Sequence, residues 1–430
     1  MKKRRRVKKK TDKFSNKFKR FFSNLKHSFF DEVDGDINSK SSFSILEVVF
    51  ITFISVVFGI VIGYILTYSR NYATVSNSKA SEIVTTYQNI LDNYYEEVDD
   101  EALADAAIQG MIHYLDDPYS NYLDQSDTSS FNESVDGFIV GIGVVVTYQD
   151  DYNVIIKVND DSPASKVGLQ VDDVIIRVDQ KDVNGLYGSD LTSLIRGEVD
   201  TDVVITVLRG EEELDYTVTR AVIELEVVHH DVLVYEDMLV GYIQIDSFAS
   251  NSYTQFKKAL DELEKKKIES LVIDVRSNSG GHLLQTKQIL SMFFNKKTVL
   301  YQIENRNRSK KVYSDSKESR SYPIAVLINN GSASASEILA SCFQDNYKNA
   351  TIVGTNSYGK GTVQKSQDLS SGSSIKYTTQ KWLTAKGEWL NDVGVSPDVY
   401  MEQSDAYYEN MCSDTDVQLQ AALKALKESN

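Results

Sequence analysis

One glycine-bounded segment of the chain is rich in serine, Gly331-Ser-Ala-Ser-Ala-Ser-Glu337. The apolar run Ile324–Ile328 precedes it and a helical pattern begins near Ile338, which predicts a strand-to-helix turn. The unpaired N–H groups of a helix start favour a developing anion, and this setting suits a nucleophilic hydroxyl. Serine is also a common N-cap residue and a nucleophile needs a base, so this segment alone leaves catalysis and capping open.

The base for such a serine is a histidine or a lysine. His229 and His230 lie in an expected strand and His282 follows a glycine pair, but no orienting acid stands out beside any of them. Lys360 stands between two glycines, in a loop expected after the apolar run 351–354. Glycines let other backbone approach closely, which is an unusual setting for a solvated lysine. A buried lysine amine loses its proton near neutral pH and can then accept the proton of a serine hydroxyl.

Three separated motifs resemble, in the same order, those of the carboxy-terminal processing (tail-specific) serine peptidases. They are Asp274-Val-Arg-Ser-Asn-Ser-Gly-Gly281, the serine segment 331–337, and Tyr358-Gly-Lys-Gly-Thr-Val-Gln364. The resemblance covers roughly residues 80–400 and includes Asp116-Asp-Pro-Tyr-Ser120 and Gly394-Val-Ser-Pro-Asp398. It implies a serine endopeptidase with a Ser-Lys dyad, in which Ser334 is the nucleophile, Lys360 the general base and Gln364 the residue that orients the lysine.

The resemblance also implies an oxyanion hole made of backbone N–H groups, those of Ala335 and of Gly281 or its neighbour Gly280. The interval from Ser334 to Lys360 is 26 positions, about one more than the family spacing. Two other serines of the run therefore stay open as nucleophiles, first Ser336 and then Ser332. The family implies no metal and no other cofactor.

Upstream of these motifs the pattern is that of strands. Short β-branched runs separated by Gly, Asp, Asn or Ser-Pro predict a small β-rich domain over about residues 137–222. Free backbone N–H groups at Gly141-Ile142-Gly143 can bind the terminal carboxylate of a peptide, although a plain glycine turn fits the spacing equally. The domain resembles the PDZ domain of the family, which implies protein or peptide substrates with accessible C-termini.

Downstream, buried strand runs alternate with helical patterns, and polar turns follow the strands. Sites of α/β proteins lie at such strand ends. The resemblance implies a catalytic core of the crotonase and ClpP type.

The N-terminal part predicts a membrane anchor. Thirteen of the residues from Met1 to Lys26 are Lys or Arg, although the 430-residue chain has a net charge of −16. The run Val48–Tyr68 carries no charge, and its 21 residues span roughly 30 Å as a helix. The positive-inside rule then places the N-terminus in the cytoplasm and the catalytic part outside a single-pass cell-membrane anchor. The basic arm is expected to contact membrane lipid rather than nucleic acid.

The sequence therefore predicts a multidomain α/β protein with an N-terminal transmembrane helix, a PDZ β-sandwich-like domain and a crotonase/ClpP-like α/β catalytic core. The expected divisions are a basic cytoplasmic segment 1–42, a transmembrane anchor 43–70, a helical region 71–132, a PDZ domain 133–222, a peptidase core 223–402 and a helical tail 403–430. The alternative is a catalytically inactive PDZ-bearing surface scaffold. A crotonase-type hydratase or isomerase ranks behind both, because it has no use for a PDZ domain or an anchor. Pairing of two copies through 81–115 and 404–430 would give a homodimer.

Overall fold

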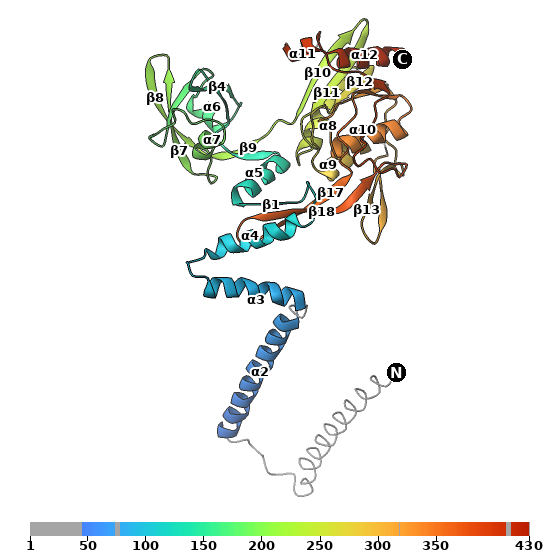
Figure 1. Ribbon diagram of the computed structural model, residues 1–430. Coiled ribbons are helices and arrows are strands. Elements are labelled where there is room, and N and C mark those ends of the chain that lie inside the picture. Colours follow the sequence, from blue (N-terminus) through green and yellow to red (C-terminus); the bar gives the residue numbers. More distant parts are fainter. Residues whose placement is uncertain (1–44, 74–77, 318, 410–413, 430) are drawn as a thin grey trace, which may run out of the picture. The chain divides into compact units, whose positions relative to one another are not determined.

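The computed structural model describes residues 45–73, 78–317, 319–409 and 414–429, and Figure 1 labels many of its helices and strands. The chain divides into two units, Met1–Leu103 and Ala104–Asn430.

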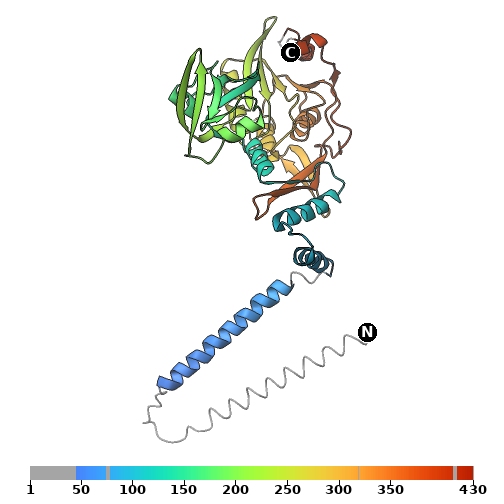
Figure 2. The ribbon, with the colours of Figure 1, turned by 60° about the vertical axis from the view of Figure 1, so that its left-hand side comes forward.

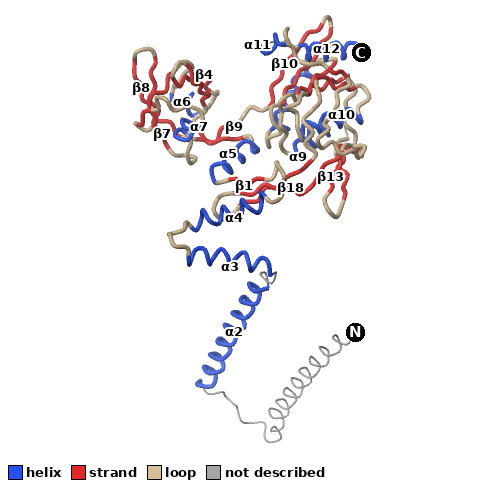
Figure 3. The backbone as a smooth tube through the Cα atoms, viewed as in Figure 1, coloured by secondary structure: helices blue, strands red, loops and turns tan. Residues whose placement is uncertain are grey.

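The described residues of the first unit are mainly helical. It contains α2 (Ile45–Ala73), which is a single uninterrupted helix in Figure 3, then α3 (Ser78–Asn93) and the first turn of α4 (Asp100–His113). Within the described ranges, no helix was found that is long and apolar enough to cross a membrane. The anchor expected at 43–70 therefore stays a prediction. The expected cytoplasmic segment 1–42 lies outside the described residues.

The β-rich domain of the second unit is built on an antiparallel sheet in the order β3-β4-β5-β7-β8, with β6 paired to β5. Its strands, green in Figure 2, enclose buried aliphatic side chains such as Ile155, Ile205 and Val207. The elements are β3 (Val144–Gln149), β4 (Tyr152–Val158), α6 (Pro163–Val167), β5 (Val174–Val178), β6 (Lys181–Asp182), α7 (Ser189–Ile195), β7 (Asp202–Arg209) and β8 (Glu212–Thr219). A separate strand pair, β2 (Phe138–Gly141) with β9 (Ala221–Glu224), brackets this sheet in the sequence.

The α/β core contains a six-stranded sheet in the order β10-β11-β12-β15-β16-β19, parallel except for β10. Its elements are β10 (Val228–Tyr235), β11 (Met238–Ile245), α8 (Ser252–Lys265), β12 (Ser270–Asp274), α9 (Leu283–Ser291), β15 (Ile324–Ile328), α10 (Ala335–Asn346), β16 (Ala350–Gly354), β19 (Val399–Tyr400), α11 (Asp405–Glu409) and α12 (Val417–Ser429).

Both faces of this sheet are covered, which explains the continuous apolar strands. Side chains alternate along a strand, so Leu271 and Ile273 of β12 pack with α8, α9 and α10 while Val272 packs with α12 on the other face. The expected tail helix thus exists as α12, and its Leu419 and Leu423 are buried against the sheet.

A second sheet of the core was not expected from the sequence. Its order is β1-β18-β13-β14, and β17 also pairs with β18. Its elements are β1 (Asn121–Leu123), β13 (Val299–Glu304), β14 (Ser309–Tyr313), β17 (Thr362–Asp368) and β18 (Ser374–Leu383), and α5 (Gln125–Asp136) follows β1. Since β17 begins two residues after Lys360, this sheet holds the lysine loop.

Candidate active site

The turns that follow β12 and β15 lie against each other. The two strands are parallel neighbours, so their carboxyl ends meet at one edge of the sheet. Asn278 joins the turns, because its carbonyl oxygen accepts hydrogen bonds from Ala333 N (3.0 Å) and Ser336 Oγ (2.8 Å). Its own side chain is buried and donates to the Ile245 carbonyl at 2.7 Å, so the contact rests on the sheet itself.

Burial and hydrogen bonding separate the three candidate serines. Ser332 and Ser336 are fully buried, and their hydroxyls donate to the carbonyl oxygens of Val275 and Asn278. Ser334 is only half-buried and has φ 54° and ψ −107° at the N-cap of α10, a backbone conformation that costs energy outside glycine. Such strain is characteristic of functional positions, and of the three serines Ser334 alone is not fully buried.

Glu337 is a site residue that the sequence reasoning did not single out. Its carboxylate is fully buried and accepts hydrogen bonds from Ser334 N (2.7 Å) and Lys360 N (2.9 Å). It also accepts from Gly359 N at 2.7 Å and Ser357 Oγ at 2.6 Å. The serine turn and the lysine loop are therefore fixed to one acceptor. The sequence feature that predicts Glu337 is its position three residues after Ser334, since a Glu three residues after a serine N-cap is the capping-box pattern.

Two glycines let the lysine loop pack closely. A Cβ on Gly359, whose φ is +88°, would lie 3.0 Å from Val393 N, and one on Gly361 would lie 2.6 Å from Trp389 Nε1. The loop is held further by Trp382 Nε1, which donates to the Lys360 carbonyl at 2.7 Å.

The Lys360 side chain is half-buried, and its surroundings lower its pKa. Burial is the main cause and the charge of Lys376 adds to it, whereas the carboxylates of Asp117 and Glu337 act in the opposite direction. Its Nζ lies over the ring of Tyr119, 4.7 Å from the ring centre. Among the described contacts none is a hydrogen bond between Lys360 Nζ and Ser334 Oγ.

Gln364 lies at the start of β17, where the register with β18 shifts. Its Nε2 donates to the hydroxyls of Thr362 (2.9 Å) and Thr378 (3.0 Å). The role predicted for it, orienting Lys360, stays a prediction.

The candidate oxyanion donors differ in what their N–H groups do. Gly280 N donates to the Asn278 side chain at 2.8 Å, whereas no acceptor is described for Gly281 N or Ala335 N. A Cβ on Gly280 would come within 3.0 Å of Ser334 Cβ and 3.2 Å of Ala335 N, so the glycine turn touches the start of α10. This geometry favours Gly281 and Ala335 over Gly280 as the pair of free donors.

His229 and His230 have carboxylate partners away from the serine segment. His229 Nε2 lies 2.9 Å from Asp246 and His230 Nε2 lies 3.1 Å from Glu262. The described contacts of neither ring include a serine of the 331–337 segment.

In the β-rich domain, Gly141, Ile142 and Gly143 connect β2 to β3. Ile142 is buried, and Gly143 has φ +85° with Ser162 so close that a Cβ would lie 2.3 Å from the serine Cβ. The carbonyl oxygens of Ile142 and Gly143 are occupied by Ala164 N and Asn159 N, while no acceptor is described for their N–H groups. The loop can therefore receive a carboxylate.

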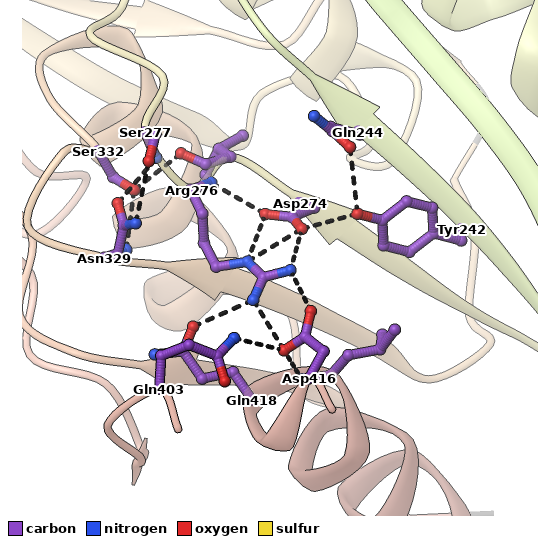
Figure 4. Close-up of polar contacts among 12 residues, drawn as sticks. Tyr242, Gln244, Asp274, Arg276, Ser277, Asn329, Ser332, Gln403, Asp416 and Gln418 are labelled. Carbon is purple, nitrogen blue, oxygen red and sulfur yellow. Dashed lines mark hydrogen bonds and ion pairs between the residues drawn. The ribbon is translucent and has the colours of Figure 1, made fainter. Parts of the chain in front are cut away.

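A separate cavity of about 1060 Å³ lies at the same strand ends, and neither Ser334 nor Lys360 lines it. Figure 4 shows the network at its wall: the Arg276 guanidinium binds Asp274 (2.6 Å) and Asp416 (2.8 Å). Tyr242 donates to Asp274 at 2.8 Å and Gln403 to Asp416 at 2.8 Å. These charges satisfy one another and tie the start of α12 to the end of β12.

Comparison with known families identifies the parts of the chain. Residues 239–401 match the model of peptidase family S41, and residues 140–219 match that of the PDZ domain. Residues 66–127 match the activating protease CtpB N-terminal domain.

Two curated relatives of Bacillus subtilis (strain 168) match most of the chain. The carboxy-terminal processing protease CtpA is 37% identical over 335 residues, which are 77% of this chain and 71% of the relative. The carboxy-terminal processing protease CtpB is 39% identical over 329 residues, 76% of this chain and 68% of the relative. Among solved structures, a photosystem II D1 C-terminal processing protease is 27% identical with a TM-score of 0.48, covering 82% of this chain and 94% of its own.

The resemblance stated from the motifs is thereby confirmed, and an inactive scaffold is not favoured. The chain belongs to peptidase family S41 and is a serine-type carboxy-terminal processing protease with a PDZ domain.

Proposed function

We propose that the chain cleaves peptide bonds with a serine–lysine dyad, in which Ser334 Oγ is the nucleophile and Lys360 Nζ the general base. The observation that carries the proposal is the buried carboxylate of Glu337, which accepts the backbone N–H groups of both residues. One buried acceptor thus sets the distance between the serine turn and the lysine loop. Catalysis by paired side chains depends on this kind of preorganisation.

The reaction begins with a neutral amine. Lys360 Nζ turns from the ring of Tyr119 toward Ser334, takes the hydroxyl proton, and Oγ attacks the scissile carbonyl carbon. The developing oxyanion is stabilised by the N–H groups of Gly281 and Ala335. The lysine ammonium then gives its proton to the departing amine, and water, deprotonated by the same lysine, hydrolyses the acyl ester and regenerates the hydroxyl.

The substrates of this proposal are proteins or peptides with accessible, unstructured C-termini. The N–H groups of Ile142 and Gly143 are offered to the terminal carboxylate, and the substrate adds as a strand beside the sheet. Shortening or amidating the C-terminus of a peptide substrate is then expected to raise KM more than it lowers kcat.

The dyad is tested with the full chain in detergent and an unfolded casein as substrate. Ser334→Ala and Lys360→Ala are expected to abolish cleavage. Ser336→Ala is the matched control, because it removes a buried hydroxyl from the same turn, and it is expected to retain measurable activity. Cleavage by Ser334→Ala at the wild-type rate would overturn the proposal, and activity lost only in Ser336→Ala would move the nucleophile to Ser336.

We also propose that residues 43–70 anchor the chain in the cell membrane, with the N-terminus in the cytoplasm and the protease outside. The support is the uncharged run Val48–Tyr68, preceded by the basic arm. The chain of residues 1–430 is expected to stay with membranes in alkaline carbonate. The double variant Val57→Arg and Ile60→Arg, which adds two charges at a cost of about 3 kcal/mol each in the bilayer, is expected to be extracted. Extraction of the unaltered chain would contradict the anchor.

A homodimer stays a prediction as well. The apolar side of α12 packs against its own sheet, so the segment 81–115 is the better candidate for pairing. Light scattering of the full chain in detergent, with and without residues 78–99, would measure it.

A further inference from the structure

Lys360 is surrounded by residues that come from three separate parts of the chain. Tyr119 and Asp117 precede β1, Lys376 belongs to β18, and Glu337 belongs to α10. No hydrogen bond or ion pair of the Lys360 amine is described, and the ring of Tyr119 is the described contact of its Nζ. Among the described residues, the carboxylates of Asp117 and Glu337 favour the charged form of this amine and the ammonium of Lys376 disfavours it.

The segment 117–120 is fixed to the second sheet. Ser120 is buried, its Oγ donates to Asp117 Oδ2 at 2.5 Å, and Thr378 N of β18 donates to the same Oγ at 3.1 Å. Tyr119 N donates to Asp117 Oδ1 at 3.1 Å. The register of β1 on β18 places Asn121 opposite Lys376, so the segment that carries Asp117 and Tyr119 leads into the strand that pairs with the strand of Lys376.

The pKa values of Asp117 and Lys376 are both lowered, for different reasons. Burial alone would raise the pKa of Asp117, but hydrogen bonds, first that of Ser120, lower it below its usual value. Lys376 is half-buried with its Nζ over the ring of Phe131 at 5.0 Å, and burial lowers its pKa. A neighbouring anion stabilises the protonated form of Lys360, and a neighbouring cation stabilises its neutral form.

The ring of Tyr119 distinguishes the two forms of the lysine. The face of an aromatic ring attracts an ammonium through its quadrupole and has no comparable attraction for a neutral amine. Loss of the proton therefore releases Nζ from the ring and leaves it free to turn toward Ser334. Burial, the Tyr358 side chain and nearby acids raise the pKa of Tyr119 to about 12, so its phenol stays neutral and protonated throughout.

We propose that Asp117 and Lys376 are positioning residues that set the proton affinity of the Lys360 amine with opposite signs, and that Tyr119 holds the protonated amine in its resting place. The proposal rests on the role of Lys360 as general base. The N-terminal segment before β1 thereby becomes part of the machinery that prepares the base.

The experiment compares pH profiles of kcat/KM for casein cleavage by the full chain at constant ionic strength. The acidic limb reports the proton on the essential base of the free enzyme. Asp117→Asn removes the anion, favours the neutral amine, and is expected to move this limb to lower pH. Lys376→Gln removes the cation and is expected to move it to higher pH. Lys376→Arg keeps the charge and is expected to leave the limb at its wild-type position.

The ring is tested with Tyr119→Phe and Tyr119→Leu. Phe keeps the aromatic face and is expected to give the wild-type limb, whereas Leu loses the attraction for the ammonium and is expected to move the limb to lower pH. A second readout does not need turnover: the 13Cε resonance of Lys360 is titrated in a Ser334→Ala background and is expected to shift its midpoint with the same signs.

The proposal is overturned if the acidic limb of the pH profile lies at the same pH in all variants. It is also overturned if the limb moves in the same direction for Asp117→Asn and Lys376→Gln. A merely structural role would change the rate without moving the limb in opposite directions. If Asp117→Asn does not fold, the variants Lys376→Gln and Lys376→Arg alone decide the direction of the pH shift. These two are expected to fold, since no hydrogen bond of the Lys376 side chain is described. Wild-type activity in Lys360→Ala would instead overturn the dyad itself, so the two failures are distinct.

Discussion

At the scale of residues, the serine run illustrates what sequence leaves open. Three serines at alternate positions have the same local signals, and their spacing to Lys360 fits more than one of them. Burial and hydrogen bonding distinguish them, because the hydroxyls of Ser332 and Ser336 donate to backbone carbonyls, whereas no such bond is described for Ser334. Those acceptors belong to a turn more than fifty residues away in the sequence, so no local pattern carries the information.

Glu337→Gln is expected to damage both the site and the fold. A carboxylate oxygen accepts where an amide NH2 donates, so the amide faces N–H groups of the serine turn and the lysine loop. We expect a loss of about 1–3 kcal/mol in the free energy of unfolding and a fall in kcat on the order of 10²-fold. Urea unfolding and casein cleavage measure the two effects.

Glu211→Gln is the matched control, because Glu211 is exposed in the turn between β7 and β8. It is expected to leave both measurements unchanged. A Glu337→Gln enzyme with wild-type kcat would show that the shared carboxylate does not position the dyad.

At the scale of elements, the apolar strands of the core sheet were predictable from the sequence, whereas the polar strands β14 and β17 were not. The runs that became β11, β12, β15 and β16 are continuously apolar because both faces of their sheet are covered. In contrast, β14 and β17 expose most of their residues and carry several polar side chains. Their strand character comes from pairing with distant partners, which composition does not reveal. The surroundings of Lys360 were therefore missed although its motif was found.

Gly281→Ala is expected to displace the turn after β12. The glycine has φ +141°, and an added Cβ would lie 2.5 Å from the Phe248 carbonyl oxygen, so backbone must move. If Gly281 N is an oxyanion donor, its displacement lowers kcat by roughly 10²- to 10³-fold with little change in KM. Steady-state cleavage of a peptide substrate measures both constants.

Gly110→Ala is the control for this substitution. Gly110 lies inside α4 with no atom near its missing Cβ, and alanine is favoured there by roughly 1 kcal/mol. We expect unchanged kcat and equal or higher stability. A Gly281→Ala enzyme whose loss appears only in KM would assign the glycine to substrate binding instead.

At the scale of the whole molecule, the order of parts was predictable and their ties were not. The PDZ domain and the peptidase core follow from strand runs and motifs. The link between the last helix and the core sheet depends on Arg276, which pairs with Asp274 two residues away and with Asp416 at the other end of the core. The motif that begins at Asp274-Val-Arg276 indicated a functional segment, yet no residue near it in the sequence predicts its contact with Asp416.

Arg276→Met is expected to destabilise the core strongly at neutral pH. The substitution leaves two buried carboxylates, Asp274 and Asp416, without their cation, and breaking such a buried pair costs about 3–5 kcal/mol. Burial would raise the pKa of Asp416, but Arg276 lowers it below the usual value. The contribution of the Asp416 carboxylate to stability is therefore fully present above its unfolded pKa of about 3.9. This contribution is lost as pH falls through the lower pKa of the folded state. In the variant the Asp416 carboxylate loses the cation that lowers its pKa and protonates more readily, so the difference in stability from wild type is expected to narrow as pH drops below neutrality. Asp416→Asn, which keeps a hydrogen-bonding side chain beside Arg276, is expected to lose less. Urea unfolding between pH 4 and pH 8 measures this difference, and a difference independent of pH would show that α12 is held by its apolar face alone.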